Sequence, residues 1–206
     1  ETGRQVRPFE IRGSEYDRAR HFFLSEFFAH RYDEALSLLP LVSSDLYIER
    51  IQVWVTARAN ERSAQVIEQV GALASLSTAA RPSDNQDDKH YTTLSTQPLS
   101  AWKAAASGTS DIEVMEGARR LPEGAYKVNR QLGYLSLNIP LSDDEALAVS
   151  YEYTYQGKRY RVGDFAGDDT PSDLIPAALI ATRAKEPTSP VWDLMMKNAY
   201  ALPGGG

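Results

Sequence analysis

Between residues 145 and 165, apolar and polar side chains alternate with a period of two. Leu147, Val149 and three tyrosines occupy the odd positions from 147 to 155, and smaller or polar residues stand between them. This period is that of a β-strand with one buried face, whereas a helix would scatter the same side chains around its axis. The chain must therefore contain a sheet, and we expect this strand near its centre.

A two-residue hairpin turn is predicted at Gln156-Gly157, directly after this strand. Such a turn pairs aromatic residues on one face and opposite charges on the other: Tyr155 with Lys158, Tyr153 with Tyr160, Tyr151 with Val162, and Glu152 with Arg161. Each cross-strand pair contributes ~0.2–1 kcal/mol. A slip of one residue would turn the tyrosines toward solvent, so we expect a firm register.

Weaker patterns predict the remaining elements. Residues 46–56 are expected to form a strand covered on both faces, with Ile51, Val53 and Val55 on one face and Ile48 and Trp54 on the other. A third strand over 132–139 would join the hairpin's sheet. Apolar residues at three- and four-residue steps predict helices over residues 14–40 (one helix or a bent pair), 62–76, 110–121 and from 189 onward.

These elements predict an α+β fold, in which an antiparallel sheet with a central β-hairpin (about 145–165) carries helices packed on one face. The length of 206 residues suits a single domain over residues 4–202. Residues 1–3 and 203–206 resemble additions made for expression. We therefore expect the chain to be a domain excised from a larger protein.

Composition excludes several classes of function. The chain carries 22 Lys and Arg against 28 Asp and Glu, a net charge of −6, which argues against a nucleic-acid partner. It has no cysteine, so disulfides and thiolate chemistry are excluded. No stretch approaches the ~20 apolar residues of a membrane-spanning helix, so we expect a chain that does not span the membrane.

Two polar segments are predicted to be loops, at residues 77–98 and 163–176. The first is long for a structureless loop, so we expect it to be either mobile or held by a partner. Both are rich in aspartate, but neither Asp84 to Asp88 nor Asp164 to Asp169 matches an EF-hand pattern. Only weak, incidental calcium binding is considered, and no metal site or cofactor is predicted.

The one enzymatic hypothesis pairs an acid from residues 143–145 with Asp164, Asp168 or Asp169 near Trp192, as in a glycoside hydrolase. It requires that Asp144 and Asp164 face each other in a cleft. The alternative, which we favour, is that acids beside turns cap backbone groups. His21, His30 and His90 are scattered in the sequence and are expected to be surface or capping residues. We therefore predict no catalytic residues and no enzyme.

The last predicted helix carries an apolar stripe that includes Trp192, Met195, Met196 and Tyr200. Two interpretations stay open for these residues. Either the stripe is buried within the chain, or it is a docking face for a partner.

Several segments together resemble one family. They are residues 16–25, 32–36, 39–43, 48–56, 132–138, 144–154, 160–163 and 192–198, and the most distinctive are Leu-Gly-Tyr-Leu-Ser-Leu-Asn at 132–138 and Trp-Asp-Leu-Met-Met-Lys-Asn at 192–198. In this order they resemble the soluble insert domains of the SprA (Sov) family, the outer-membrane translocon of the type IX secretion system. The resemblance spans most of the chain, except residues 77–98.

The resemblance implies a role in protein secretion and gliding motility at the cell surface. Members of that family form a large barrel that exports folded cargo, with a PorV-type barrel protein and a periplasmic plug as partners. It implies that this chain is a soluble domain that caps the pore or contacts partners, with the extracellular side favoured over the periplasm. It implies no catalytic residues and no cofactor. The alternative from another class is a surface glycan-binding module, with exposed tyrosine or tryptophan beside acidic loops.

Overall fold

The computed structural model describes residues 12–57, 67–169 and 172–200. Its strands are β1 (His21–Phe23), β2 (Leu46–Thr56), β3 (Ile67–Leu73), β4 (Ile112–Arg120), β5 (Tyr126–Asn129), β6 (Tyr134–Leu137), β7 (Leu147–Tyr155), β8 (Lys158–Val162) and β9 (Ile175–Ala181). The α-helices are α1 (Glu26–Ala35), α2 (Lys89–Leu94) and α3 (Leu99–Ala106). Single turns of 3-10 helix lie at η1 (Ala74–Leu76), η2 (Asn85–Asp87), η3 (Glu123–Ala125) and η4 (Trp192–Leu194).

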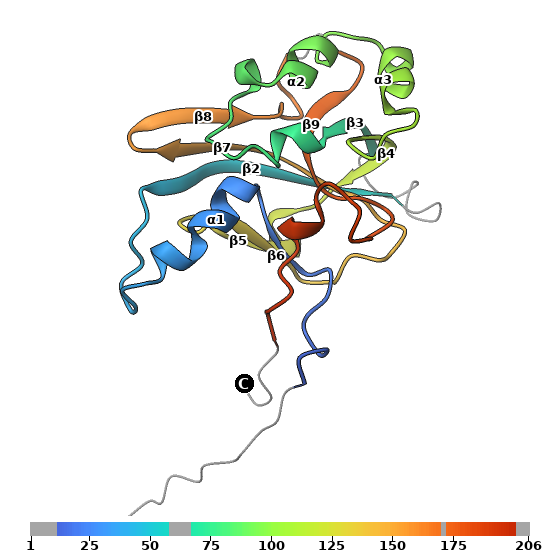
Figure 1. Ribbon diagram of the computed structural model, residues 1–206. Coiled ribbons are helices and arrows are strands. Elements are labelled where there is room, and N and C mark those ends of the chain that lie inside the picture. The colour runs from blue at the N-terminus through green and yellow to red at the C-terminus, as the bar shows by residue number, and fades with distance from the viewer. Residues whose placement is uncertain (1–11, 58–66, 170–171, 201–206) are drawn as a thin grey trace, which may run out of the picture.

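Five strands close into a barrel in the order β2-β4-β3-β9-β7, because β7 pairs back onto β2. Of these pairs, β3 and β9 are parallel and the others are antiparallel. Two strands share the edge of β7 that does not pair with β2. Strand β9 pairs with this edge near Leu147, and β8 pairs with it near Tyr155. The hairpin strand is therefore a wall of a closed barrel, and β8 extends beyond the barrel (Figure 1).

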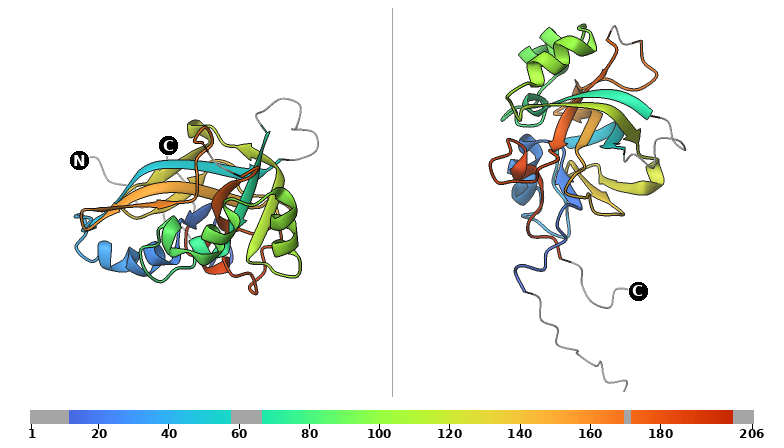
Figure 2. Two further views of the ribbon diagram at one scale, coloured as in Figure 1. Left: turned by 90° about the horizontal axis from the view of Figure 1, so that it is seen from above. Right: turned by 90° about the vertical axis from the view of Figure 1, so that its right-hand side faces the viewer.

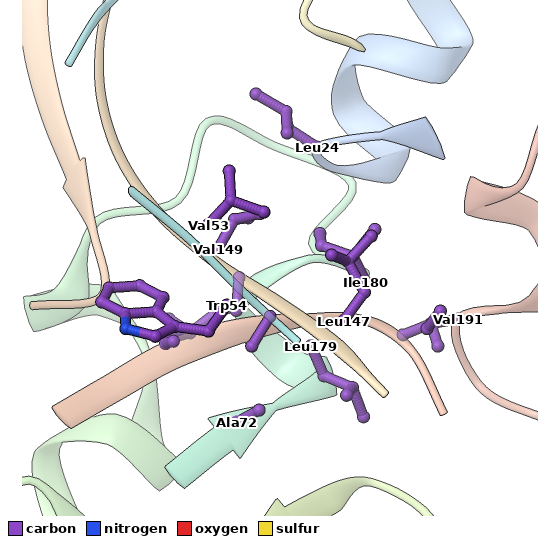
Figure 3. Close-up of a cluster of buried hydrophobic side chains, with 14 of the residues drawn as sticks. Leu24, Val53, Trp54, Ala72, Leu147, Val149, Leu179, Ile180 and Val191 are labelled. Atoms are coloured by element: carbon purple, nitrogen blue, oxygen red, sulfur yellow. The ribbon is translucent and has the colours of Figure 1, made fainter. Parts of the chain in front are cut away.

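The barrel interior holds one large ring among small side chains. Trp54 stands opposite Ala148, and Ala148 stands opposite Leu179, so these three side chains point to the same side. Ala72 and Ala177 are paired in the same way, and all five residues are 0% exposed. Figure 3 shows Trp54 on the side of β2 opposite to Val53 and Val149, which face Leu24. A barrel of five strands leaves little space inside, so alanines around one tryptophan fill it.

The predicted α+β fold, with helices packed on one face of an open sheet, is wrong. The structure is mostly β, and the three α-helices of the described residues lie outside the closed barrel (Figures 1 and 2). Phe28 of α1 packs against Tyr151 and Tyr153 of β7, whereas Trp102 of α3 lies against Gly71 of β3. A closed barrel presents outer walls in every direction, so helices on separate walls each cover part of it.

The α+β prediction is wrong because two segments that were predicted to be helices are strands. In the segment 62–76 the structure has β3, with residues 62–66 outside the described range, and in the segment 110–121 it has β4. Val70 and Leu73 are three residues apart and fit a helical period, but each packs on a different side of a buried strand. The apolar run of β9 was not predicted at all. These three strands supply the pairings that close the barrel.

A small second sheet, with the order β1-β6-β5, lies beside the barrel. The strand predicted over 132–139 is present as β6, but it belongs to this sheet and not to that of the hairpin. The helix predicted from Ser14 is wrong up to Phe23. Ala19 has a φ of 57°, which is incompatible with a right-handed helix, and β1 follows it. Only α1 remains of that helix, and it ends at Ala35 rather than near Pro40.

The hairpin itself is confirmed with its predicted register, including Tyr153 opposite Tyr160 and Glu152 opposite Arg161. Gln156 and Gly157 both have positive φ, of 48° and 75°, as a primed two-residue turn requires. Strand β2 has the predicted bounds. A bulge near Glu49 moves Ile48 to the same face as Ile51, so the predicted separation of these two residues is wrong.

The helix predicted from Ser189 is reduced to the single turn η4, after which Met195 forms a bridge with Phe22 of β1. The predicted terminal additions at 1–3 and 203–206 lie outside the described residues. None of the described helices has both the length and the apolar character needed to cross a membrane.

Candidate functional site

The two aspartate-rich segments, which lie about 80 residues apart in the sequence, meet in the structure around Arg161 of β8. Its guanidinium Nη2 donates to Asp168 Oδ2 at 2.5 Å and to Asp164 Oδ1 at 3.3 Å. From the other segment, Asp84 accepts a hydrogen bond from the Arg161 backbone N–H at 3.0 Å. We call this group the arginine cluster, and it comprises Asp84, Asn85, Tyr91, Arg161, Asp164 and Asp168, which line one open pocket.

Asn85 and Tyr91 complete the arginine cluster from the first segment. The Tyr91 hydroxyl donates to Asp164, with both carboxylate oxygens at 3.0 Å. The Asn85 side chain, 3% exposed, donates to the Gly163 carbonyl and accepts from the Gly163 N–H. The segment 77–98 was expected to be either mobile or held by a missing partner, but it is held by its own chain and contains α2.

Burial raises the pKa of Asp164 and Tyr91, whereas the neighbouring carboxylates Asp168, Asp164 and Glu152 raise the pKa of Arg161 against the effect of burial. Asp164 is 8% exposed, and burial raises the pKa of its carboxyl group, while Tyr91 and Arg161 act in the opposite direction. Burial and the neighbouring Asp164 raise the pKa of the Tyr91 hydroxyl to about 12. Phe165, which is fully buried, lies beneath the guanidinium groups of Arg161 and Arg50, at 5.2 Å and 3.8 Å from the ring centroid. Asp168 also lies 3.7 Å from the Arg50 guanidinium, so the acids of the arginine cluster hold two arginines in place.

The other acidic group, at residues 143–145, lies in a different environment. Lys185 Nζ donates to the backbone carbonyls of Ser142 and Glu145, and Asp143 and Asp144 lie near its charge. Partial burial lowers the pKa of Lys185 despite these acids. Asp164 lines the open pocket around Arg161, and Asp144, which lies near Lys185, is not among the residues that line it, so this pocket does not hold the pair that the hydrolase hypothesis requires.

The histidines lie on three separate elements. His21 of β1 contacts the Ser136 hydroxyl at 2.8 Å, while His30 and His90 are exposed on α1 and α2. Within residues 12–57, 67–169 and 172–200, no group of three or more His, Asp or Glu side chains is arranged to hold a metal ion.

The residues proposed as a docking face are divided between the core and the surface. Met195 and Met196 are 5% and 8% exposed, because the chain after η4 passes beside β1. Trp192 is half-buried against the core and carries Lys197 over its ring at 4.9 Å. Tyr200 is half-buried and donates to the Gly13 carbonyl at 3.1 Å. The two methionines are therefore covered by this chain, and only parts of the two aromatic rings are accessible.

A surface that the sequence did not single out follows α1. Leu38, Leu39 and Leu41 are 64%, 65% and 66% exposed, although leucine is among the residues most often buried. We call residues 36–42 the leucine loop. Leu39 lies in the segment 14–40 that is predicted to be helical, but α1 ends four residues before Leu39.

Hydrogen bonds at its base and within it fix the shape of the leucine loop. The Ser43 N–H donates to the Ala35 carbonyl at 3.0 Å, which ties the end of the loop to the end of α1. Within the loop, the Leu41 N–H donates to the Leu38 carbonyl at 3.0 Å. The Ser44 hydroxyl, just after the loop, donates to the Gln131 carbonyl at 2.7 Å. The leucines are therefore presented outward by a closed turn.

No protein-family model matches the sequence, and no curated protein is found to be similar to it. The resemblance to the SprA family therefore rests on the segments quoted above.

Proposed function

We propose that this chain is an interaction domain of a type IX secretion translocon, as its resemblance to the SprA family suggests. Its role would be to cap the pore or to contact partners, and the leucine loop would be the contacting surface. In this account the domain carries no catalytic centre, lies at the outer membrane, and faces the extracellular side.

The exposure of three leucines on one closed turn carries this proposal. Burying a leucine side chain contributes about 1.5–3 kcal/mol, so exposing three of them to water is unfavourable unless a partner covers them. Because the loop is already closed by backbone hydrogen bonds, little conformational freedom is lost when it docks.

The charges around the leucine loop favour a protein partner over a lipid bilayer. No charged residue occurs between Glu34 and Asp45, so the loop itself is neutral. However, exposed carboxylates border it at Asp33, Glu34 and Asp45. These carboxylates would be repelled by anionic lipid headgroups. We therefore propose that the partner surface is an apolar groove with lysine or arginine at its rim.

A pull-down from outer-membrane extract of a type IX-secreting bacterium tests this proposal, with the chain as bait. The variant Leu38→Ser/Leu39→Ser/Leu41→Ser removes the apolar surface, and Ile139→Ser is the matched control because Ile139 is 81% exposed elsewhere on the molecule. We expect the wild type and the control to capture the translocon barrel, its PorV-type partner, the plug or cargo, identified by mass spectrometry. Capture of these proteins by the triple variant at the wild-type level would contradict the proposal.

The alternative of a glycan-binding module stays a prediction. Tyr91 and Tyr153 lie beside the acidic segment 84–88, and both rings are buried. A glycan array with the wild-type chain tests this alternative, and binding that survives in the triple variant would favour it over the leucine-loop proposal.

A further inference from the structure

A pocket of about 220 Å³ lies beside the leucine loop, and we call it the α1 pocket. The residues that line it come from four places: α1, the leucine loop, the start of β2 and the turn before β6. Leu38 lines this pocket and is also 64% exposed. A partner that covers the leucine loop therefore also reaches the α1 pocket.

The charges that line the α1 pocket are unbalanced. Glu34 and Asp45 bring two carboxylates and Arg31 brings one guanidinium, so the net charge is −1. Both acids are exposed, and among the described residues neither forms an ion pair with Arg31 or with another cation. Arg31 instead lies over the rings of Phe27 and Tyr155, at 5.4 Å and 5.0 Å from their centroids. The two carboxylates are therefore available to a cation from outside the chain.

The end of α1 adds to the negative potential of the α1 pocket. The last carbonyl groups of a helix carry partial negative charge, which nearby cations stabilise and nearby anions oppose. Helix α1 ends at Ala35, and its last turn contains Asp33 and Glu34 but no basic residue. A cation bound in the pocket would relieve the repulsion between these acids and the end of the helix.

The chemistry of the α1 pocket suits an arginine side chain. A guanidinium group has five N–H donors in one plane, so it can bond to two separate carboxylates, and its flat face stacks on aromatic rings. Tyr32 lines the pocket and is half-buried, so part of its side chain is accessible. A bare metal ion fits less well, because within the described ranges no three His, Asp or Glu side chains are arranged to hold one.

We propose that the α1 pocket receives an arginine side chain of the partner, while apolar residues on either side of that arginine cover the leucine loop. Glu34 and Asp45 bind the guanidinium group. This inference rests on the proposed function and deepens it, since it fixes the chemistry of the partner as an arginine flanked by apolar residues. The leucines supply the apolar contact area, and the two carboxylates supply the preference for a positive charge.

Titration of the purified chain with capped pentapeptides tests this inference, with amide chemical shifts in NMR as the readout. The probe is Leu-Ser-Arg-Ser-Leu, and two matched peptides carry glutamine or glutamate at the centre. We expect the arginine peptide to bind at least about tenfold more tightly than the glutamine peptide, because its charge meets two carboxylates. The glutamate peptide should bind more weakly than both.

The variant Glu34→Gln/Asp45→Asn removes both charges and keeps the size of the side chains. The fold should be retained, because both side chains are exposed and the backbone carbonyls of these residues accept hydrogen bonds from Ser37 and Gln156 as before. We expect this variant to bind the arginine and glutamine peptides equally.

A control removes the same two charges from exposed positions outside the α1 pocket. Asp87→Asn/Glu123→Gln should bind all three peptides as the wild type does. Equal binding of the arginine and glutamine peptides by the wild type would overturn the inference, as would absent binding of the arginine peptide. So would an unchanged preference for arginine in Glu34→Gln/Asp45→Asn. Tighter binding of the glutamate peptide would also overturn it and would assign recognition to Arg31.

The peptide titration and the pull-down fail separately. If the triple leucine variant loses the translocon proteins but the wild-type chain shows no preference for arginine, the proposed function stands and this inference fails. If the chain prefers the arginine peptide but the triple leucine variant captures the translocon proteins at the wild-type level, the arginine site stands and the proposed function fails.

Discussion

Asp164 shows how a single buried carboxyl group affects stability. Burial raises its pKa in the native state above the ordinary value of 3.8, so the native state binds this proton more tightly than the unfolded state. The free energy of unfolding should therefore fall as the pH rises from about 3.8 through the native pKa. Stability contributed by the protonated form is present at low pH and lost at higher pH.

The variant Asp164→Asn isolates this effect, because it keeps the shape of the side chain without the titration. We expect the free energy of unfolding of the wild type minus that of the variant to decrease with rising pH across this window, then to level off. Urea denaturation at several pH values measures it. Glu113, whose pKa burial also raises, titrates in both proteins and cancels. A difference that grows with pH would show that Arg161 and Tyr91 outweigh burial.

Gly71 is a second residue whose role can be tested. A Cβ atom at this position would lie 2.5–2.7 Å from ring atoms of Trp102, which is fully buried between α3 and β3. We expect Gly71→Ala to lower the free energy of unfolding by ~1–3 kcal/mol through overpacking. At Gly124 a Cβ would meet no atom within 4 Å, so Gly124→Ala should be neutral or stabilising by up to ~1 kcal/mol. Equal effects at the two glycines would contradict this account of α3 packing.

At the scale of the element, the β7–β8 hairpin depends on a turn with an unfavourable residue. Gln156 has a φ of 48°, a region that asparagine tolerates better than glutamine does. We expect Gln156→Asn to raise the free energy of unfolding by up to ~1 kcal/mol. Thermal denaturation checks this, with Gln86→Asn as the control because Gln86 has no positive φ. A loss of stability in Gln156→Asn alone would mean that the turn needs the longer side chain.

The elements that the sequence predicted correctly are those with a period that only one structure fits. The alternation from Leu147 to Tyr155 and the turn after it determine the hairpin and its register, and β2 has its predicted bounds. The prediction of helices in the segments of β3 and β4 was wrong because apolar residues three and four apart also occur in a strand buried on both faces. In β9, the run Ala177-Ala178-Leu179-Ile180-Ala181 is continuous, and such a run has no period to detect.

At the scale of the whole molecule, closure of the barrel could not be predicted from local patterns. It depends on pairings between distant segments, above all the parallel pair of β3 with β9 and the return of β7 onto β2. The same long-range pairing brings Asp84 and Asn85 to β8, so the arginine cluster could not be predicted either, although both acidic segments were noted. The leucine loop was missed because Leu39 continues the helical spacing beyond the end of α1.

Two surfaces thus result from the whole fold: the leucine loop beyond α1, and the arginine cluster at β8. The first carries the proposed function, and its contribution to binding can be estimated. Each Leu→Ser change in the leucine loop should weaken binding to the translocon by about tenfold, since burial of a leucine contributes about 1.5–3 kcal/mol. Isothermal titration with the purified barrel measures this series, and Ile139→Ser should leave the affinity unchanged. Equal losses at Ile139 and at the leucines would indicate a nonspecific apolar effect.

The most direct test of the central claim is photo-crosslinking in cells. A photoreactive residue is placed at position 39 of this chain, expressed in a type IX-secreting bacterium, and at position 139 as the control. The account predicts a crosslink from position 39 to the translocon barrel, its PorV-type partner, the plug or cargo, and none from position 139. If position 39 crosslinks to these proteins no more than position 139 does, the leucine loop is not the contact surface and the proposed function is contradicted.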